Sequence, residues 1–393
     1  MPPVTLSSPN DAFEGFWTSN LPGNDLSVAA TNGRPTLLIP NLTRFSIQDY
    51  LTLQFKDPVL QRYNLIALDL PGWPGTNTPL LRQQADKYDE WVAAAIIGDF
   101  CLTMNLKDVH FLGITSWAGK ILPRLAALFP SIPKSISNSC VIADAPMTEE
   151  LTEGIAGTLD QWTHATCMEE LEELVQGELY MWFHDDVPLD PRIFDDFLTN
   201  WRGQRIHTSA LLFGMTYFTT GMTKEAAALV QCPLLVVQGD INPHFTPESA
   251  RLFAAHYPNA CSSVHILHGA PPAISSSSEF APALHHLVVS HIEHSVLVSP
   301  TTSTFNGFSS TSGSNAQLAP ISIQERRAVG MRDAMKRCIS IAPEWLKKDL
   351  KSRDPLSAMS FSQRSPEQLA EMHERWYDRW LEMEKEECIN FGK

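Results

Sequence analysis

The sequence lacks the short signatures of several common sites. It contains no His-Glu-x-x-His, no P-loop and no Gly-x-Gly-x-x-Gly after a strand, so we expect no metal and no cofactor. Its seven cysteines are odd in number, widely spaced and without a Cys-x-x-Cys pair. This pattern argues against a disulfide scaffold and a zinc cluster, and it fits a reducing compartment.

Positive charge and long apolar runs are also scarce. The chain has 29 Lys and Arg residues against 44 Asp and Glu residues, a formal net charge of −15. That balance repels phosphate backbones and anionic lipids, so we expect no nucleic-acid and no membrane partner. No signal-peptide pattern opens the sequence, and no run of about 18 apolar residues occurs. We expect a cytoplasmic protein that acts on a small-molecule substrate.

The first third of the chain alternates between two kinds of apolar pattern. Short buried runs predict strands at residues 36–40, 64–68, 109–112 and 135–142. Helical spacing of apolar residues lies between them, at residues 88–104 and 117–129. Such alternation predicts a mostly parallel sheet with helices on both faces, whose first half covers residues 25–147.

The remaining residues divide into four zones. Residues 148–230 are rich in acids and aromatics and predict an inserted helical cap, whereas residues 231–295 return to strand–helix alternation as the second half of the core. Residues 296–320 are rich in Ser and Thr and predict a flexible linker. Residues 321–393 predict a C-terminal helical extension.

One helix of this extension carries an apolar stripe. Ser365 and Pro366 form a typical helix start. The stripe that follows consists of Leu369, Met372, Trp376, Trp380 and Met383. It predicts that the helix packs against its own domain or against a second copy, as a homodimer through the C-terminal helix; a partner protein is the alternative.

The strongest chemical signal is the turn at residues 113–119, Gly-Ile-Thr-Ser-Trp-Ala-Gly, between a buried strand and an amphipathic helix. A serine at such a junction is held on a strained bend, with its hydroxyl at the carboxyl edge of the sheet and the next N–H beside it. Ser116 is therefore the candidate nucleophile. Its motif departs from Gly-x-Ser-x-Gly, because Ile114 and Ala118 replace the two glycines. An N-capping serine is the alternative interpretation.

Three more landmarks follow in a familiar order. They are DLPGWPGT at residues 69–76, VVQG at 236–239 with PESA at 247–250, and His268-Gly269-Ala270 with Glu279. With the serine turn, they make the chain resemble the α/β-hydrolase superfamily from about Pro35 to His294. The resemblance implies an α/β-hydrolase fold with an inserted cap, and a Ser, acid and His triad.

The resemblance leaves the acid and the base displaced. The usual acid position holds Asn242, which cannot carry the charge that stabilises an imidazolium. Asp144, after the predicted strand 135–142, replaces it in our interpretation, with Asp240 as the other candidate. Pro272 occupies the position of the general base, so His268, four residues earlier, is the preferred histidine.

Other histidines and the oxyanion hole complete the predicted site. His244 and His184 are the alternatives to His268 as the base. The resemblance assigns the oxyanion hole to the N–H groups of Trp117 and Leu42, with Asn41 as a further donor. The ring of Trp117 is expected to lie nearest the substrate.

Within the superfamily, the chain resembles the cofactor-free 3-hydroxy-4-oxoquinaldine 2,4-dioxygenase group. The resembling segments are Thr115-Ser116 followed by a large ring, the run Ile142-Ala143-Asp144-Ala145, and the cap fragment Met181-Trp182-Phe183-His184. That group deprotonates a bicyclic aromatic substrate with a His–Asp pair, and the carbanion reacts with dioxygen.

Three functions are consistent with these residues. The first is hydrolysis of an ester, thioester or C–C bond in a small, largely apolar and aromatic metabolite through Ser116, in secondary metabolism. The second is a cofactor-independent dioxygenase, lyase or cyclase, in which Ser116 positions the substrate. The third is a catalytically degenerate binding or scaffolding protein, which the losses at Asn242 and Pro272 favour.

Overall fold

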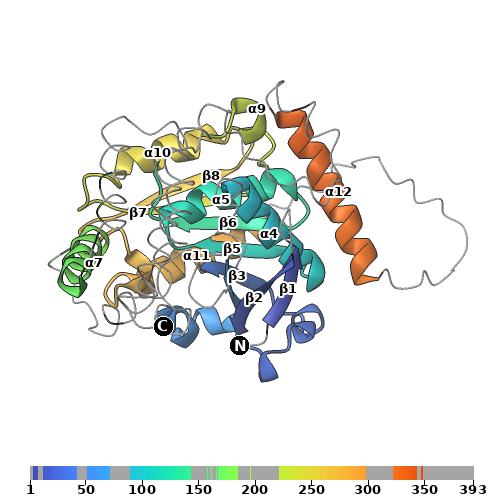
Figure 1. Ribbon diagram of the computed structural model, residues 1–393, viewed down its shortest axis with the longest axis horizontal. Helices are drawn as coiled ribbons and strands as arrows, with labels where there is room; N and C mark the ends of the chain where they lie inside the picture. Colours follow the sequence, from blue (N-terminus) through green and yellow to red (C-terminus); the bar gives the residue numbers. More distant parts are fainter. Residues whose placement is uncertain are drawn as a thin grey trace, which may run out of the picture.

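The fold is a mixed sheet covered by helices (Figure 1). The computed structural model describes residues 3–7, 12–41, 51–70, 89–142, 167–184, 221–297 and 322–342, with single positions elsewhere. Asp144, Leu42, residues 298–320 of the predicted linker and the apolar stripe at residues 369–383 lie outside these ranges, while residues 296 and 297 end the helix that precedes the linker.

The described residues build an eight-stranded sheet in the order β1-β2-β4-β3-β5-β6-β7-β8. The strands are β1 (Pro3–Ser7), β2 (Ala12–Ser19), β3 (Thr36–Asn41), β4 (Asn64–Asp69), β5 (Val109–Gly113), β6 (Pro133–Ser139), β7 (Leu234–Gly239) and β8 (Ser262–Leu267). All neighbouring strands from β4 through β3, β5, β6 and β7 to β8 are parallel. β1 and β2 extend the sheet beyond β4 as antiparallel strands. The predicted mostly parallel sheet is confirmed by this pairing. Its central strands are buried, as in sheets covered on both faces.

The sheet includes strands that precede residue 25, where the sequence predicts the first half of the core to begin. β2 pairs with β4 along Phe16–Ser19 and β1 pairs with β2, so both strands contribute to the same sheet as the core strands. Two short 3₁₀ helices, η1 (Pro22–Asn24) and η2 (Leu26–Ala30), connect β2 to β3.

Helices cover both faces of the sheet. Those of eight residues or more are α4 (Glu90–Thr103), α5 (Ser116–Leu128), α7 (Met168–Phe183), α10 (Pro247–His256), α11 (Ala281–Leu297) and α12 (Ile323–Ile341). The shorter elements are α2 (Thr52–Lys56), η3 (Leu60–Arg62), α9 (Lys224–Ala227) and η5 (Ile274–Ser276). In Figure 1, α4 and α5 lie in front of the central strands and α11 lies behind them. None of the helices among the described residues combines the length and the apolar character needed to cross a membrane.

Helix α12 (Ile323–Ile341), the last helix in the described part of the chain, forms a third layer on one face. It packs on α4 and α5, where Gly330 leaves room for Leu102: a Cβ on this glycine would lie 2.5 Å from the leucine side chain. Arg327 forms two hydrogen bonds of 2.7 Å with Asp99, a carboxylate with no exposed surface. This cover explains why α4 is buried on nearly every side rather than along one stripe.

Candidate active site

Ser116 lies at the junction predicted from the sequence. β5 ends at Gly113, and α5 begins at Ser116 on the carboxyl edge of the sheet. A Cβ at Gly113 would lie 2.2 Å from Asn138 Oδ1 and 2.6 Å from the Ala118 Cβ. Only glycine therefore allows the strand and the helix to cross this closely.

The strained bend expected at Ser116 is absent. The non-glycine residues with positive φ in the described part of the chain are Asn24, Asn105, Asp108, Cys140 and His184. Thr115 instead makes the turn in an extended conformation (φ −139°, ψ 164°), and its hydroxyl accepts the Ala118 N–H at 3.3 Å. The N-cap is therefore Thr115, and Ser116 is the first helical residue.

The first turn of α5 leaves one N–H available. The Ser116 N–H donates to the sulfur of Cys140, a thiol whose pKa burial raises well above its usual range. The Ala118 N–H donates to the Thr115 hydroxyl, and the Gly119 N–H donates to the Thr115 carbonyl. No hydrogen bond within the described ranges uses the Trp117 N–H, the group predicted to stabilise an oxyanion.

The other half of the predicted oxyanion hole is only partly described. Leu42 lies outside the described residues, whereas Asn41 ends β3 and is fully buried. The Asn41 side-chain amide donates to Asp69 Oδ1 at 2.6 Å, across the ends of β3 and β4. One of its two N–H groups is therefore committed to holding this sheet edge together.

No hydrogen bond among the described residues joins Ser116 to an imidazole. Ser116 is 7% exposed. The imidazole hydrogen bonds go to other groups: His110 to Ser135, His256 to Met222, His268 to Asp240, His285 to Asp57 and His294 to Ser290. Among the described residues, therefore, no histidine is hydrogen-bonded to Ser116 as a base.

The predicted base, His268, belongs to an acid–base pair. Its Nδ1 donates to Asp240 Oδ2 at 2.7 Å, and Asp240 Oδ1 accepts the Gly269 N–H at 2.8 Å. The Gly269 N–H and then His268 hold the pKa of Asp240 below its usual value. The carboxylate that orients His268 in this structure is thus Asp240, while Asp144 lies outside the described residues.

The pair lies on the same edge of the sheet as Ser116 but at a distance. Asp240 follows β7 and His268 follows β8, so both stand at carboxyl ends of parallel strands. β6 and β7 separate β8 from β5, which corresponds to roughly 14 Å at ordinary strand spacing. The His268 side chain is 88% exposed, whereas residues 270–275 of the loop after β8 are buried.

Residues at or beside the two family positions for acid and base contact α7 instead. Asn242 Nδ2 donates to the Met181 carbonyl at 2.8 Å, and the Ala273 N–H, next to Pro272, donates to the Trp182 carbonyl at 3.0 Å. Both acceptors are last-turn carbonyls of α7, which have no partner within the helix. The sequence reveals the missing acid and base at these positions, but not their new role.

The alternative bases also lie away from Ser116. His184 ends α7 with a φ of +61°, and its ring stacks on Tyr180 at 5.4 Å. His244 is exposed in the loop after β7, where its N–H donates to Asn242 Oδ1 at 2.8 Å. The carboxylate hydrogen bond of His268 makes it the preferred base of the three.

The fold has many solved relatives. Three structures of low sequence identity align with this chain: an esterase from Thermogutta terrifontis (13% identity, TM-score 0.58, 75% of this chain and 99% of that one), a bromoperoxidase from Bacillus anthracis (13%, 0.58, 74% and 100%) and a carboxylesterase of the Thaumarchaeon Nitrososphaera gargenis (15%, 0.56, 74% and 100%). No curated protein matches. The model of the alpha/beta hydrolase fold family matches residues 47–274, more than half of the sequence. The chain therefore belongs to the alpha/beta hydrolase fold family.

Proposed function

We propose that the protein hydrolyses an ester, thioester or C–C bond in a small, largely apolar metabolite, with Ser116 as the nucleophile. The observation that carries this proposal is the available Trp117 N–H beside Ser116 at the start of α5. A helix N-terminus also favours the negative charge that develops on the carbonyl oxygen during attack.

His268 is the general base in this proposal, and Asp240 orients it. Because Nδ1 donates to the carboxylate, Nε2 carries the lone pair that accepts the Ser116 proton. The serine oxygen then bonds to the substrate carbonyl carbon, and the leaving group departs with the proton returned by His268. Water, activated by the same imidazole, releases the acid and restores the serine. For these transfers the His268 imidazole must come within hydrogen-bond reach of the Ser116 hydroxyl.

An aromatic substrate is the preferred class within this proposal. Trp182 of α7 stacks on Phe245 of the loop after β7, with ring centroids 5.3 Å apart. Trp117 is half-buried and directly follows the nucleophile. Rings at the junction of cap and core favour planar apolar ligands over charged ones.

Turnover of aryl esters tests the proposal. Wild-type protein is expected to hydrolyse 1-naphthyl acetate, and Ser116→Ala to lose that activity while keeping its unfolding temperature. Ser290→Ala, an exposed serine on α11, is the matched control and should hydrolyse at the wild-type rate. Hydrolysis that survives Ser116→Ala contradicts the assignment of the nucleophile.

A binding protein without turnover is the second candidate. Asn242 and the Ala273 N–H favour it, because they hold α7 with the loops that carry the acid and the base in the family. This candidate predicts that aromatic carboxylate esters raise the unfolding temperature and are recovered intact. Conversion of the same esters by wild-type protein, lost in Ser116→Ala, rejects it.

A further inference from the structure

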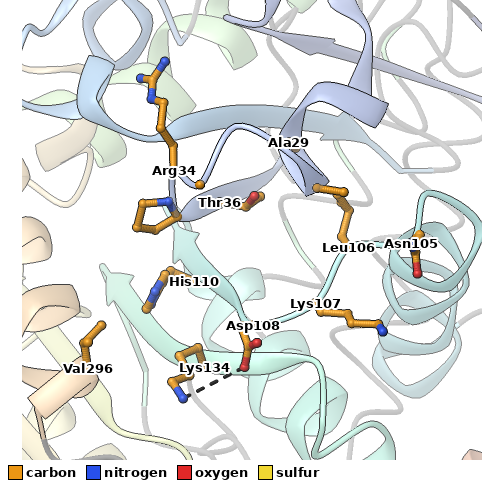
Figure 2. Close-up of a pocket in the computed structure, with 13 residues that line it drawn as sticks. Ala29, Arg34, Thr36, Asn105, Leu106, Lys107, Asp108, His110, Lys134 and Val296 are labelled. Carbon is orange, nitrogen blue, oxygen red and sulfur yellow. Dashed lines mark ion pairs between the residues drawn. The ribbon is translucent and has the colours of Figure 1, made fainter. Parts of the chain in front are cut away.

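A cavity lies at the opposite edge of the sheet from Ser116. Its volume is about 560 Å³, within the range of small-molecule sites. Thr36, His110 and Lys134 line it from the amino ends of β3, β5 and β6, and the turn at residues 105–108 closes one side (Figure 2). Val296, near the end of α11, contributes from the other side.

The cavity lining is basic in a strongly acidic protein. It contains Arg34, Lys107 and Lys134 against one carboxylate, Asp108, whereas the chain as a whole carries a formal charge of −15. The Arg34 guanidinium donates to the carbonyls of residues 61, 62 and 63, and in Figure 2 it points away from the other basic side chains. Lys107 and Lys134 are therefore the cations available to a ligand.

Asp108 neutralises Lys134 only weakly. The two charged groups are 3.9 Å apart, at the limit of an ion pair, and the Asp108 side chain is 77% exposed. Such exposed pairs contribute little because water and salt screen them. A ligand anion can therefore replace Asp108 as the partner of Lys134, particularly where apolar contacts add to its affinity.

The wall of the cavity offers those contacts. Leu106, Pro35 and Val296 supply apolar surface. His110 is buried beside them and its Nδ1 lies 2.8 Å from Ser135 Oγ. Burial, and to a smaller extent the charges of His291 and Lys134, lower the pKa of His110 to about 4. The imidazole is neutral at pH 7 and adds no charge to the cavity.

We propose that this cavity binds a small organic anion, a carboxylate or a phosphate monoester with a short apolar chain. Lys134 binds the anionic group, and Val296, on the same side of Asp108 in Figure 2, contacts the apolar part. Lys107, on the other side of Asp108, adds positive charge to the cavity. The site shares no residue with the proposed hydrolytic site, so the two proposals stand or fall separately.

Calorimetric titration with hexanoate, hexyl phosphate and 1-hexanol tests the site. Both anions, or the one whose chemistry the site prefers, are expected to bind more tightly than the neutral alcohol. Lys107→Ala/Lys134→Ala should weaken anion binding by about tenfold or more, since a charge contact and a neighbouring positive charge are lost. Lys336→Ala, an exposed lysine on α12, is the control and should bind as the wild type. Equal binding of anions and alcohol, no binding at all, or binding unchanged in the double variant overturns the proposal.

Asp108→Asn is expected to tighten anion binding, the opposite of the effect of the lysine substitutions. Asp108 has a φ of +51°, a conformation that asparagine also tolerates, so the backbone is kept while the competing carboxylate is removed. Anion binding should tighten by about threefold to tenfold. Weaker or unchanged binding contradicts the roles assigned to Asp108 and Lys134. Ser116→Ala should bind the anions as the wild type does, whether or not it hydrolyses esters.

Discussion

The two edges of the sheet place histidine in opposite environments. At the carboxyl edge, His268 is 88% exposed and hydrogen-bonded to a carboxylate. At the amino edge, His110 is buried, hydrogen-bonded to a serine hydroxyl, and its pKa is lowered to about 4. Of the two, only the first arrangement gives the imidazole a carboxylate that orients it for proton transfer.

The comparison explains how an acid–base pair persists without the family's usual residues. The loops after β7 and β8 lie against each other: a Cβ at Gly239 would lie 2.1 Å from the Ala270 carbonyl oxygen. That contact brings Asp240 and His268 together even though Asn242 and Pro272 occupy the usual positions. The same loops use Asn242 and Ala273 to hold the cap helix.

The largest expected effect is on catalysis at the exposed histidine. His268→Ala should reduce the rate of aryl ester hydrolysis by about 10²–10⁴-fold, the usual contribution of a general base. Asp240→Asn should reduce the rate less, because it alters the orientation of His268 but keeps its imidazole. Steady-state kinetics measure both.

The control for this experiment is His244→Gln, which alters an exposed histidine of the neighbouring loop. Its rate should match the wild type. If His268→Ala also hydrolyses esters at the wild-type rate, His268 is not the base and the contrast between the two edges loses its functional meaning.

The buried histidine should affect stability rather than rate. Its pKa falls from 6.5 in the unfolded chain to about 4 in the fold, so the unfolded state binds the proton more readily. The contribution of His110 to the free energy of unfolding is therefore fully present above pH 6.5. It declines as the pH falls toward 4, by at most about 3 kcal/mol. His110→Asn should flatten part of this slope in chemical unfolding at several pH values.

His285 and His291 bear on the same measurement. Burial lowers the pKa of each, so a smaller slope of the same sign remains in the His110 variant. An unfolding free energy that rises on acidification between pH 6.5 and 4, or an unchanged slope in His110→Asn, contradicts the assigned environment of His110.

The contact between the loops after β7 and β8 should be sensitive to one methyl group. Gly239→Ala forces a Cβ against the backbone oxygen of Ala270 and should lower the free energy of unfolding by about 1–3 kcal/mol. Gly177→Ala in α7 is the control, since nothing lies within 4 Å of its Cβ position, and it should stabilise the helix slightly. Equal effects of the two substitutions in thermal unfolding contradict the close approach.

The smallest expected effect tests the contact with the cap. Asn242→Asp restores a carboxylate at the family's acid position but cannot donate to the Met181 carbonyl. We expect a loss of about 1 kcal/mol and faster amide exchange at the C-terminal end of α7. Unchanged exchange there indicates that this hydrogen bond does not hold the cap.

The parallel core could be predicted from the sequence because its signals are local. The apolar runs that form β3, β5 and β7 are short and bounded by turns, and the helical spacing before β5 matches α4. β2 was missed, since Gly15 interrupts its pattern and pairing with β4 depends on a distant strand.

The site could be predicted only in part, for a related reason. Ser116 and its turn are encoded by adjacent residues, whereas the contacts of Asn242 and Ala273 with α7 depend on segments that meet only in the folded chain. The conformation of the turn also depends on which residue caps the helix. Thr115 has the same capping chemistry as Ser116, and it takes the N-cap and removes the expected strain. The resemblance to the cofactor-free dioxygenase group stays a prediction.

The reaction of a fluorophosphonate with the folded protein tests the central claim most directly. Mass spectrometry of the labelled protein is expected to locate the adduct on Ser116, with slower labelling in His268→Ala. Folded protein that remains unlabelled, or that carries the adduct on another residue, contradicts the claim that Ser116 is the nucleophile.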